Sequence, residues 1–105
     1  MSHFYDMQGN PLTLEQWSKR FNDPERIIAQ QTIGDYWIST VWLGLDHSHH
    51  YGPPLIFETM VFDADRSSGY EHRMVRYTTL EEAKAGHARL AAVLKRLQRL
   101  KAAAA

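Results

Sequence analysis

The sequence predicts a single α+β domain over residues 1–105, in which a four-stranded antiparallel β-meander packs against a long C-terminal helix with a short N-terminal helix nearby. Apolar residues alternate with period two between residues 27 and 77, and they step by three and four residues from 78 to 102. A chain of 105 residues is typical of one domain. Three Trp, five Tyr and four Phe supply a core and argue against wholesale disorder.

Residues 1–26 are expected to form a loop followed by a short helix. Thr13-Leu14-Glu15-Gln16 resembles a capping box, and Trp17 and Phe21 follow at helical spacing. Asn22-Asp23-Pro24 ends the segment. Because two helical turns do not persist alone in water, Trp17 and Phe21 must pack against a larger element.

Four strands are expected within residues 27–77. The dipeptide Gly34-Asp35 is typical of a two-residue hairpin turn between the first two strands, and Pro53-Pro54 can only open the third. The second and third strands are apolar on both faces, so that one face needs the long helix and the other needs the N-terminal helix or a partner. The expected strands are Ile27–Ile33, Tyr36–Leu43, Leu55–Phe62 and Glu71–Tyr77.

Residues 78–102 are expected to form the C-terminal helix, with Thr79 near its start and basic residues near its end. Such a helix is roughly 36 Å long, whereas an eight-residue strand spans about 27 Å. Its last turns should project past the sheet and expose Leu97 and Leu100, which either fray or meet a second copy or a partner. Residues 103–105 are a cloning remnant or a frayed tail. The sheet-facing stripe is expected to contain Leu80, Ala83, His87, Leu90, Leu94 and Leu97.

Charge and composition exclude several classes of protein. Twelve basic residues balance twelve acidic ones, which disfavours a strongly basic nucleic-acid binder. The balance hides an asymmetry, because residues 76–105 have seven basic and two acidic groups. The absence of cysteine excludes disulfides and Cys-ligated zinc. No apolar run reaches the length of a membrane helix, and no signal-peptide pattern opens the chain, so we expect no membrane association.

The loop Asp46-His47-Ser48-His49-His50 is the one cluster with metal-ligand side chains. His47, His49 and His50, joined by the distant His72, are the candidate ligands, but adjacent ligands on one loop rarely close a site unaided. We therefore expect no metal and no cofactor, with Asp46 bonded to nearby backbone. No serine lies in a nucleophile motif, so no catalytic residue is expected.

Two further polar residues have structural interpretations. Glu58 shares a face with apolar residues, and a half-buried carboxylate there predicts a partner in Arg73 or Arg76. His87 lies on the apolar stripe of the long helix, which predicts a packed histidine.

Two long strings, STVWLGLDH at residues 39–47 and PPLIFETMVF at residues 53–62, resemble a family of small bacteriophage and prophage proteins. The similarity covers nearly the whole chain. His49 and His50 stand where the family pattern has a glycine-rich loop. The resemblance implies a phage setting, and it implies no activity or catalytic residues.

These observations favour a non-enzymatic accessory protein that acts through protein–protein contact, with itself as a homodimer or with a host or defence factor. Two alternatives remain: a small metal-dependent enzyme using the Asp46–His50 loop, and a nucleic-acid-binding module using the basic C-terminal helix. The expected location is the cytoplasm, which is that of the host cell if the protein is phage-encoded, and a place in the virion is left open. The expected partner-binding residues are Trp37, Trp42, Leu94, Leu97 and Leu100.

Overall fold

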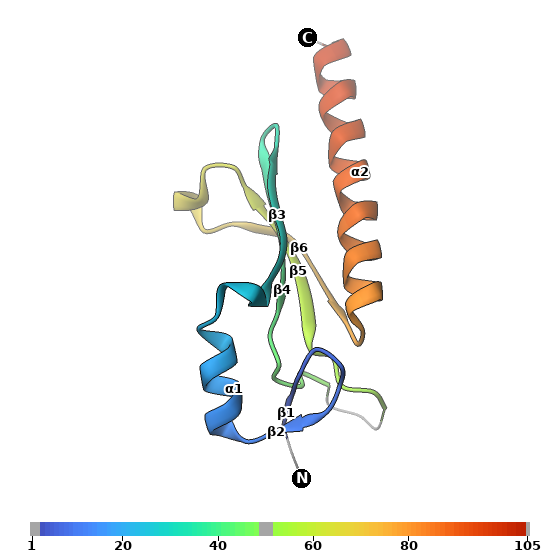
Figure 1. Ribbon diagram of the computed structural model, residues 1–105. Coiled ribbons are helices and arrows are strands. Elements are labelled where there is room, and N and C mark those ends of the chain that lie inside the picture. The colour runs from blue at the N-terminus through green and yellow to red at the C-terminus, as the bar shows by residue number, and fades with distance from the viewer. Residues whose placement is uncertain (1–2, 49–51, 105) are drawn as a thin grey trace.

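The computed structural model describes residues 3–48 and 52–104. It confirms the predicted α+β fold, with one helix lying along one face of a four-stranded antiparallel sheet (Figure 1). The strands follow one another in chain order, as expected of a meander. They are β3 (Ile27–Ile33), β4 (Tyr36–Trp42), β5 (Phe57–Asp63) and β6 (Glu71–Tyr77), and the covering helix is α2 (Leu80–Ala104).

The N-terminal region contains more structure than the predicted loop and helix. Two short strands, β1 (Phe4–Tyr5) and β2 (Pro11–Leu12), pair in a separate two-stranded sheet. The helix α1 (Leu14–Phe21) follows, and the 3₁₀ turn η1 (Pro24–Arg26) leads into β3. Strands of two residues have no detectable alternation in the sequence, so the expectation of a plain loop was wrong here.

The helix α1 sits at one end of the large sheet and does not cover its second face (Figure 1). Thr13 and Gln16 form the predicted capping box. Trp17 packs between Phe4 and Phe21, with ring centroids 5.0 Å apart in both pairs. Its indole nitrogen donates to the carbonyl of Leu43 at 2.8 Å, which fixes the helix beside the end of β4.

Five predicted boundaries need correction, and two of them are small: β5 ends at Asp63 and α2 begins at Leu80. Strand β4 ends at Trp42 and β5 begins at Phe57, because the amides of Leu43 and Gly44 both donate to the carbonyl of Ile56 (2.8 and 3.2 Å) and the regular ladder stops there. Gly44 has a φ of +70°, which turns the chain away from the sheet. The helix α2 runs to Ala104, so residues 103 and 104 are helical, and residue 105 lies outside the described residues.

The core lies between α2 and the face of the sheet that it covers. Trp42 and Phe57, paired across β4 and β5, are fully buried near one end, and Ile38 and Val61 are buried towards the other. The helix α2 contributes small residues where it lies closest to the sheet, including Ala83, Gly86 and Ala91, and contributes Leu94 farther along. The opposite face of the sheet, called here the outer face, faces away from α2.

Candidate functional site

His87 is the polar centre of the core. Its Nδ1 lies 2.7 Å from the hydroxyl of Thr40, which lies 2.6 Å from the hydroxyl of Thr59. Its Nε2 lies 3.0 Å from the side-chain oxygen of Gln31, so the neutral ring donates to Gln31 and accepts from Thr40. This confirms the prediction that His87 is packed in the core. Its hydrogen bonds link α2 to β3 and β4.

Burial lowers the pKa of His87 below its ordinary value of 6.5. The unfolded chain therefore takes up a proton at a higher pH than the folded protein does, and the free energy of unfolding should fall as the pH drops below about 6.5. Chemical denaturation between pH 7 and pH 5 measures this slope. The variant His87→Gln should have a shallower slope than the wild type, and an equal slope would contradict the assignment.

Asp46 is bonded to nearby backbone, as predicted. One carboxylate oxygen accepts from the amides of Ser48 (2.9 Å) and Leu55 (3.0 Å). Burial alone would raise the pKa of Asp46, but these hydrogen bonds keep it below the ordinary value. His49 and His50 lie outside the described residues.

His72 lies at the other end of the sheet from this loop. Its Nε2 is 2.5 Å from the carboxylate of Asp63, which is paired with Tyr36 at the far end of β4. About 20 Å of strand separates that pair from Trp42, where the loop begins. The structure therefore does not bring His47 and His72 together, and no cluster of three metal-ligating side chains occurs within residues 3–48 and 52–104.

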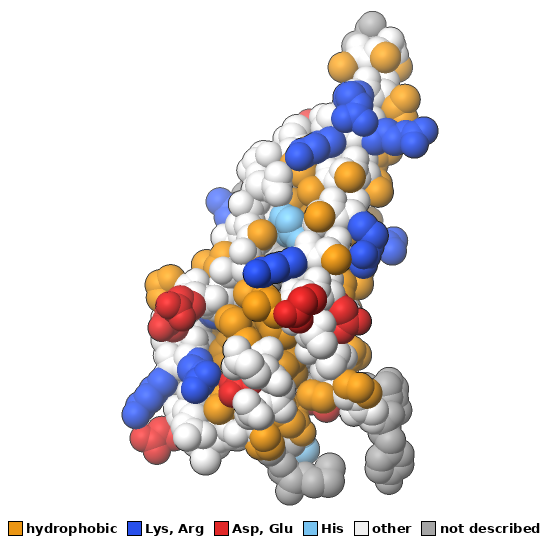
Figure 2. Space-filling view, turned by 45° about the vertical axis from the view of Figure 1, so that its right-hand side comes forward, with side chains coloured by type: hydrophobic (Ala, Val, Ile, Leu, Met, Phe, Trp, Pro, Cys, Tyr) orange, Lys and Arg blue, Asp and Glu red, His pale blue; other side chains and the backbone are white. Residues whose placement is uncertain are grey.

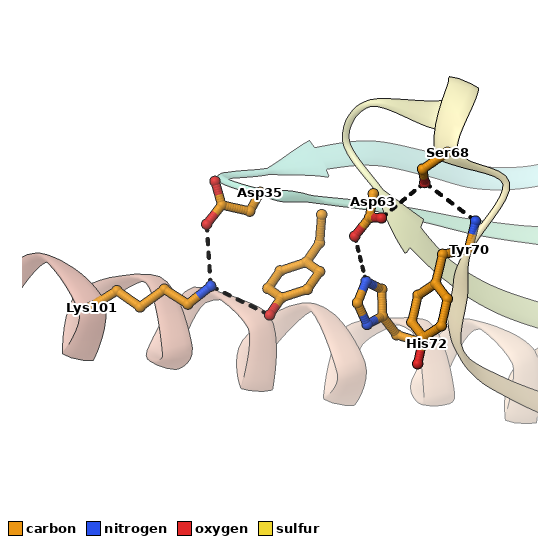
Figure 3. A network of polar contacts seen from close by, with 7 residues as sticks. Asp35, Asp63, Ser68, Tyr70, His72 and Lys101 are labelled. Atoms are coloured by element: carbon orange, nitrogen blue, oxygen red, sulfur yellow. Dashed lines mark hydrogen bonds and ion pairs between the residues drawn. The ribbon is translucent and has the colours of Figure 1, made fainter.

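Asp63 forms a small polar network with its neighbours (Figure 3). His72 and the hydroxyl of Ser68 bind different oxygens of this carboxylate, at 2.5 and 2.9 Å. In a catalytic triad the serine donates its hydrogen bond to the histidine. Here Ser68 donates to the aspartate, so His72 does not activate it. The hydrogen bond from His72 lowers the pKa of Asp63. The network fastens the turn η2 (Arg66–Ser68) to the sheet.

The structure places the five predicted partner-binding residues in three different environments. Trp42 and Leu94 are buried in the core, so they offer no surface to a partner, which corrects that part of the expectation. Trp37 is half-buried on the outer face. Leu97 and Leu100 are 39% and 56% exposed, but Leu97 still lies beside Tyr36 and His72 of the sheet. The end of α2 extends past the sheet, as the comparison of helix and strand lengths predicted (Figure 1).

The helix α2 has two apolar stripes, and the sequence prediction merged them into one. The first contains His87, Ala91 and Leu94 and faces the sheet. The second repeats at intervals of three, four and three residues, so its members share another side of the helix. It is less buried, and Val93 is 53% exposed. This second stripe consists of Leu90, Val93, Leu97 and Leu100.

A groove runs between the second stripe and β6. It consists of two adjoining hollows that share Arg73, Leu90 and Val93 as lining residues. The sheet contributes Val75 and Tyr77 to one hollow, and Val61, Tyr36 and His72 to the other. Lys101 binds Asp35 at the β3–β4 turn and contacts Tyr36, which holds the end of α2 against the sheet, and residues of β6 form the facing wall of the groove. This surface is the candidate functional site.

The outer face of the sheet is partly covered by its own polar side chains. Arg66 lies 4.4 Å over the ring of Trp37, and the ring of Phe62 packs beside the same tryptophan. In the centre, Arg76 donates to Glu58 at 3.1 Å, which confirms the predicted pairing. The face is thus more polar than its apolar alternation suggested.

Removing one partner of the Glu58–Arg76 pair should have an asymmetric effect on stability. The Glu58 side chain is 11% exposed, whereas that of Arg76 is 29% exposed and reaches water more readily. Arg76→Met leaves the carboxylate unpaired and should lower the free energy of unfolding by about 1–3 kcal/mol. Glu58→Gln should cost less. Urea denaturation of the two variants measures the difference, and the reverse order would contradict this account.

The basic residues of α2 do not form a single face. Lys84 and Lys95 lie on the side of the helix away from the second stripe, while Arg89 and Arg96 lie beside it. Figure 2 shows Lys and Arg side chains along the helix with hydrophobic ones between them, and acidic side chains near its base. This arrangement gives no continuous track for a phosphate backbone.

Comparisons with known proteins find no match to this chain among family models, curated proteins or solved structures. Neither helix in the described part of the chain is long and apolar enough to cross a membrane. The candidate site therefore has to be interpreted from its own geometry.

Proposed function

We propose that the protein acts by binding another protein and is not an enzyme, and that the groove between α2 and β6 is its contact surface. The observation that supports this most directly is the second apolar stripe of α2, which the sheet leaves exposed. Monomeric proteins rarely expose contiguous apolar surface without using it. The resemblance to small phage proteins suggests that the partner is a host protein.

The shape of the groove favours an amphipathic helix as its occupant. The stripe has the three-and-four spacing by which helices pack side by side. Strand β6 forms the second wall, so a docked helix would contact both α2 and the edge of the sheet. Helices that place one apolar face in a groove are a common mode of recognition.

Apolar residues of the two stripes should behave differently if this assignment is right. Leu94→Asp places a charge in the core and should unfold the protein, because Leu94 is only 6% exposed. Val93→Asp with Leu100→Asp changes exposed positions and should alter the free energy of unfolding by less than about 1 kcal/mol. Thermal denaturation compares them, and similar losses of stability would show that the second stripe belongs to the core.

The proposal is tested with a synthetic helical peptide that has leucines at heptad spacing and equal numbers of Glu and Lys beside them. Titrating it into ¹⁵N-labelled protein should shift the amide signals of residues 71–77 and 89–104. The Val93→Asp, Leu100→Asp variant should show no such shifts. Binding elsewhere, or no binding at millimolar peptide, would overturn the groove as the contact surface.

A further inference from the structure

We infer that the helix recognised by this groove is acidic and belongs to a different protein, an inference that rests on the proposed function. The groove is bordered by cations on both sides. Arg89 and Arg96 lie next to the second stripe on α2, and Arg73 lies across the groove on β6. All three side chains are exposed, and none of them forms an ion pair within the described residues.

Few acidic groups lie near these three arginines in the described part of the chain. The helix has no Asp or Glu after Glu82, so residues 83–104 are uniformly neutral or basic. The acidic groups at the end of the groove near the β3–β4 turn already have partners, since Asp63 binds His72 and Asp35 binds Lys101 (Figure 3). A partner with carboxylates beside its apolar stripe would satisfy the arginines at both rims.

The same charges argue against a second copy of α2 in this groove. In a pair of helices the residues that flank the apolar seam lie opposite one another and set the choice of partner. Pairing α2 with itself would place Arg89 and Arg96 near the arginines of the other copy. The homodimer expected from the sequence is therefore not favoured through this surface.

The apolar residues of the second stripe favour a protein partner over nucleic acid. Phosphates would also pair with the three arginines, but they offer nothing to the exposed side chains of Val93, Leu97 and Leu100 on the same stripe. An amphipathic acidic helix satisfies both features at once. We therefore assign the groove to such a helix, and nucleic-acid binding becomes an outcome of the test.

The test uses three helical peptides with the same leucine stripe and with Glu, Lys or mixed Glu and Lys beside it. Fluorescence anisotropy at low salt should give an affinity about tenfold higher for the Glu peptide than for the Lys peptide. Raising the salt concentration to 500 mM should remove most of this preference. A 20-base-pair DNA duplex should bind more weakly than the Glu peptide.

A matched pair of charge variants locates the effect. Arg89→Glu with Arg96→Glu should reverse the preference, so that the Lys peptide binds more tightly. Lys84→Glu with Lys95→Glu makes the same change in net charge on the other side of α2 and should leave the Glu peptide preferred, because its charges lie farther from the bound peptide.

Each result bears on a distinct claim. Equal binding of all three peptides would overturn the inference and leave the proposed function in place. No binding of any peptide would overturn both. Tighter binding of DNA than of the Glu peptide, or a concentration-dependent dimer in sedimentation that Arg89→Glu with Arg96→Glu abolishes, would also overturn the inference.

Discussion

The variant Trp42→Ala is expected to lose about 3–5 kcal/mol of unfolding free energy, which is a large part of the stability of a domain of this size. Trp42 is 1% exposed and packs in the core cluster with Phe57, Ile56 and Tyr77. Its indole nitrogen also donates to the carbonyl of Tyr5 at 3.1 Å, so the side chain connects the sheet to the N-terminal strands. Urea denaturation followed by circular dichroism measures the loss.

Trp37 is the natural control for this prediction. It lies five residues earlier on the same strand, but on the outer face, where it is half-buried between Arg66 and Phe62. Trp37→Ala should therefore cost about 1 kcal/mol, because the site is open and leaves no enclosed cavity. Equal losses for the two variants would mean that the outer face is buried in solution.

The variant Gly86→Ala is expected to destabilise the protein by about 1–3 kcal/mol, although alanine usually stabilises a helix relative to glycine by about 1 kcal/mol. A Cβ atom at this position would lie 2.2–2.4 Å from the ring and hydroxyl of Tyr77. Tyr77 is buried at the end of β6, so its ring cannot move aside without disturbing the core. The close approach of α2 to β6 depends on this glycine.

Two further variants separate steric overlap from helix propensity. Ala85→Gly, at the exposed neighbouring position, should follow ordinary propensity and destabilise by about 1 kcal/mol. In a Tyr77→Leu background, which leaves room for a methyl group, Gly86→Ala should cost much less than in the wild type. An unchanged cost in that background would show that the overlap with Tyr77 is not the cause.

The sequence predicted the main elements because their periodicities are strong and uninterrupted. The hairpin turn at Gly34-Asp35 and the capping box at Thr13 and Gln16 depend on local chemistry, so both were predictable. The strands β1 and β2 were missed, since two residues are too few to show alternation. Their pairing depends on contacts made after folding, such as the bridge between Phe4 and Leu45.

The candidate site was harder to predict than the fold. Leu94 and Leu97 are both apolar and lie at helical spacing, and only the crossing of α2 over the sheet decides that one is buried and the other exposed. Trp37 and Trp42 lie on opposite faces of a strand that is apolar on both, so the sequence could not say which face the helix covers. The spacing of Leu90, Val93, Leu97 and Leu100 was visible in the sequence, and it was the one available signal of a second stripe.

The central claim is that one apolar stripe of α2 is left open for a partner. Since the chain has no cysteine, single cysteines can replace Leu100, on the second stripe, and Ala88, which is exposed about 120° around the helix from it, and be labelled with a polarity-sensitive dye. In dilute protein both labels should report water, and addition of the Glu peptide should shift the emission to the blue at position 100 alone. A blue-shifted label at position 100 before any peptide is added, or equal responses at the two positions, would contradict the claim.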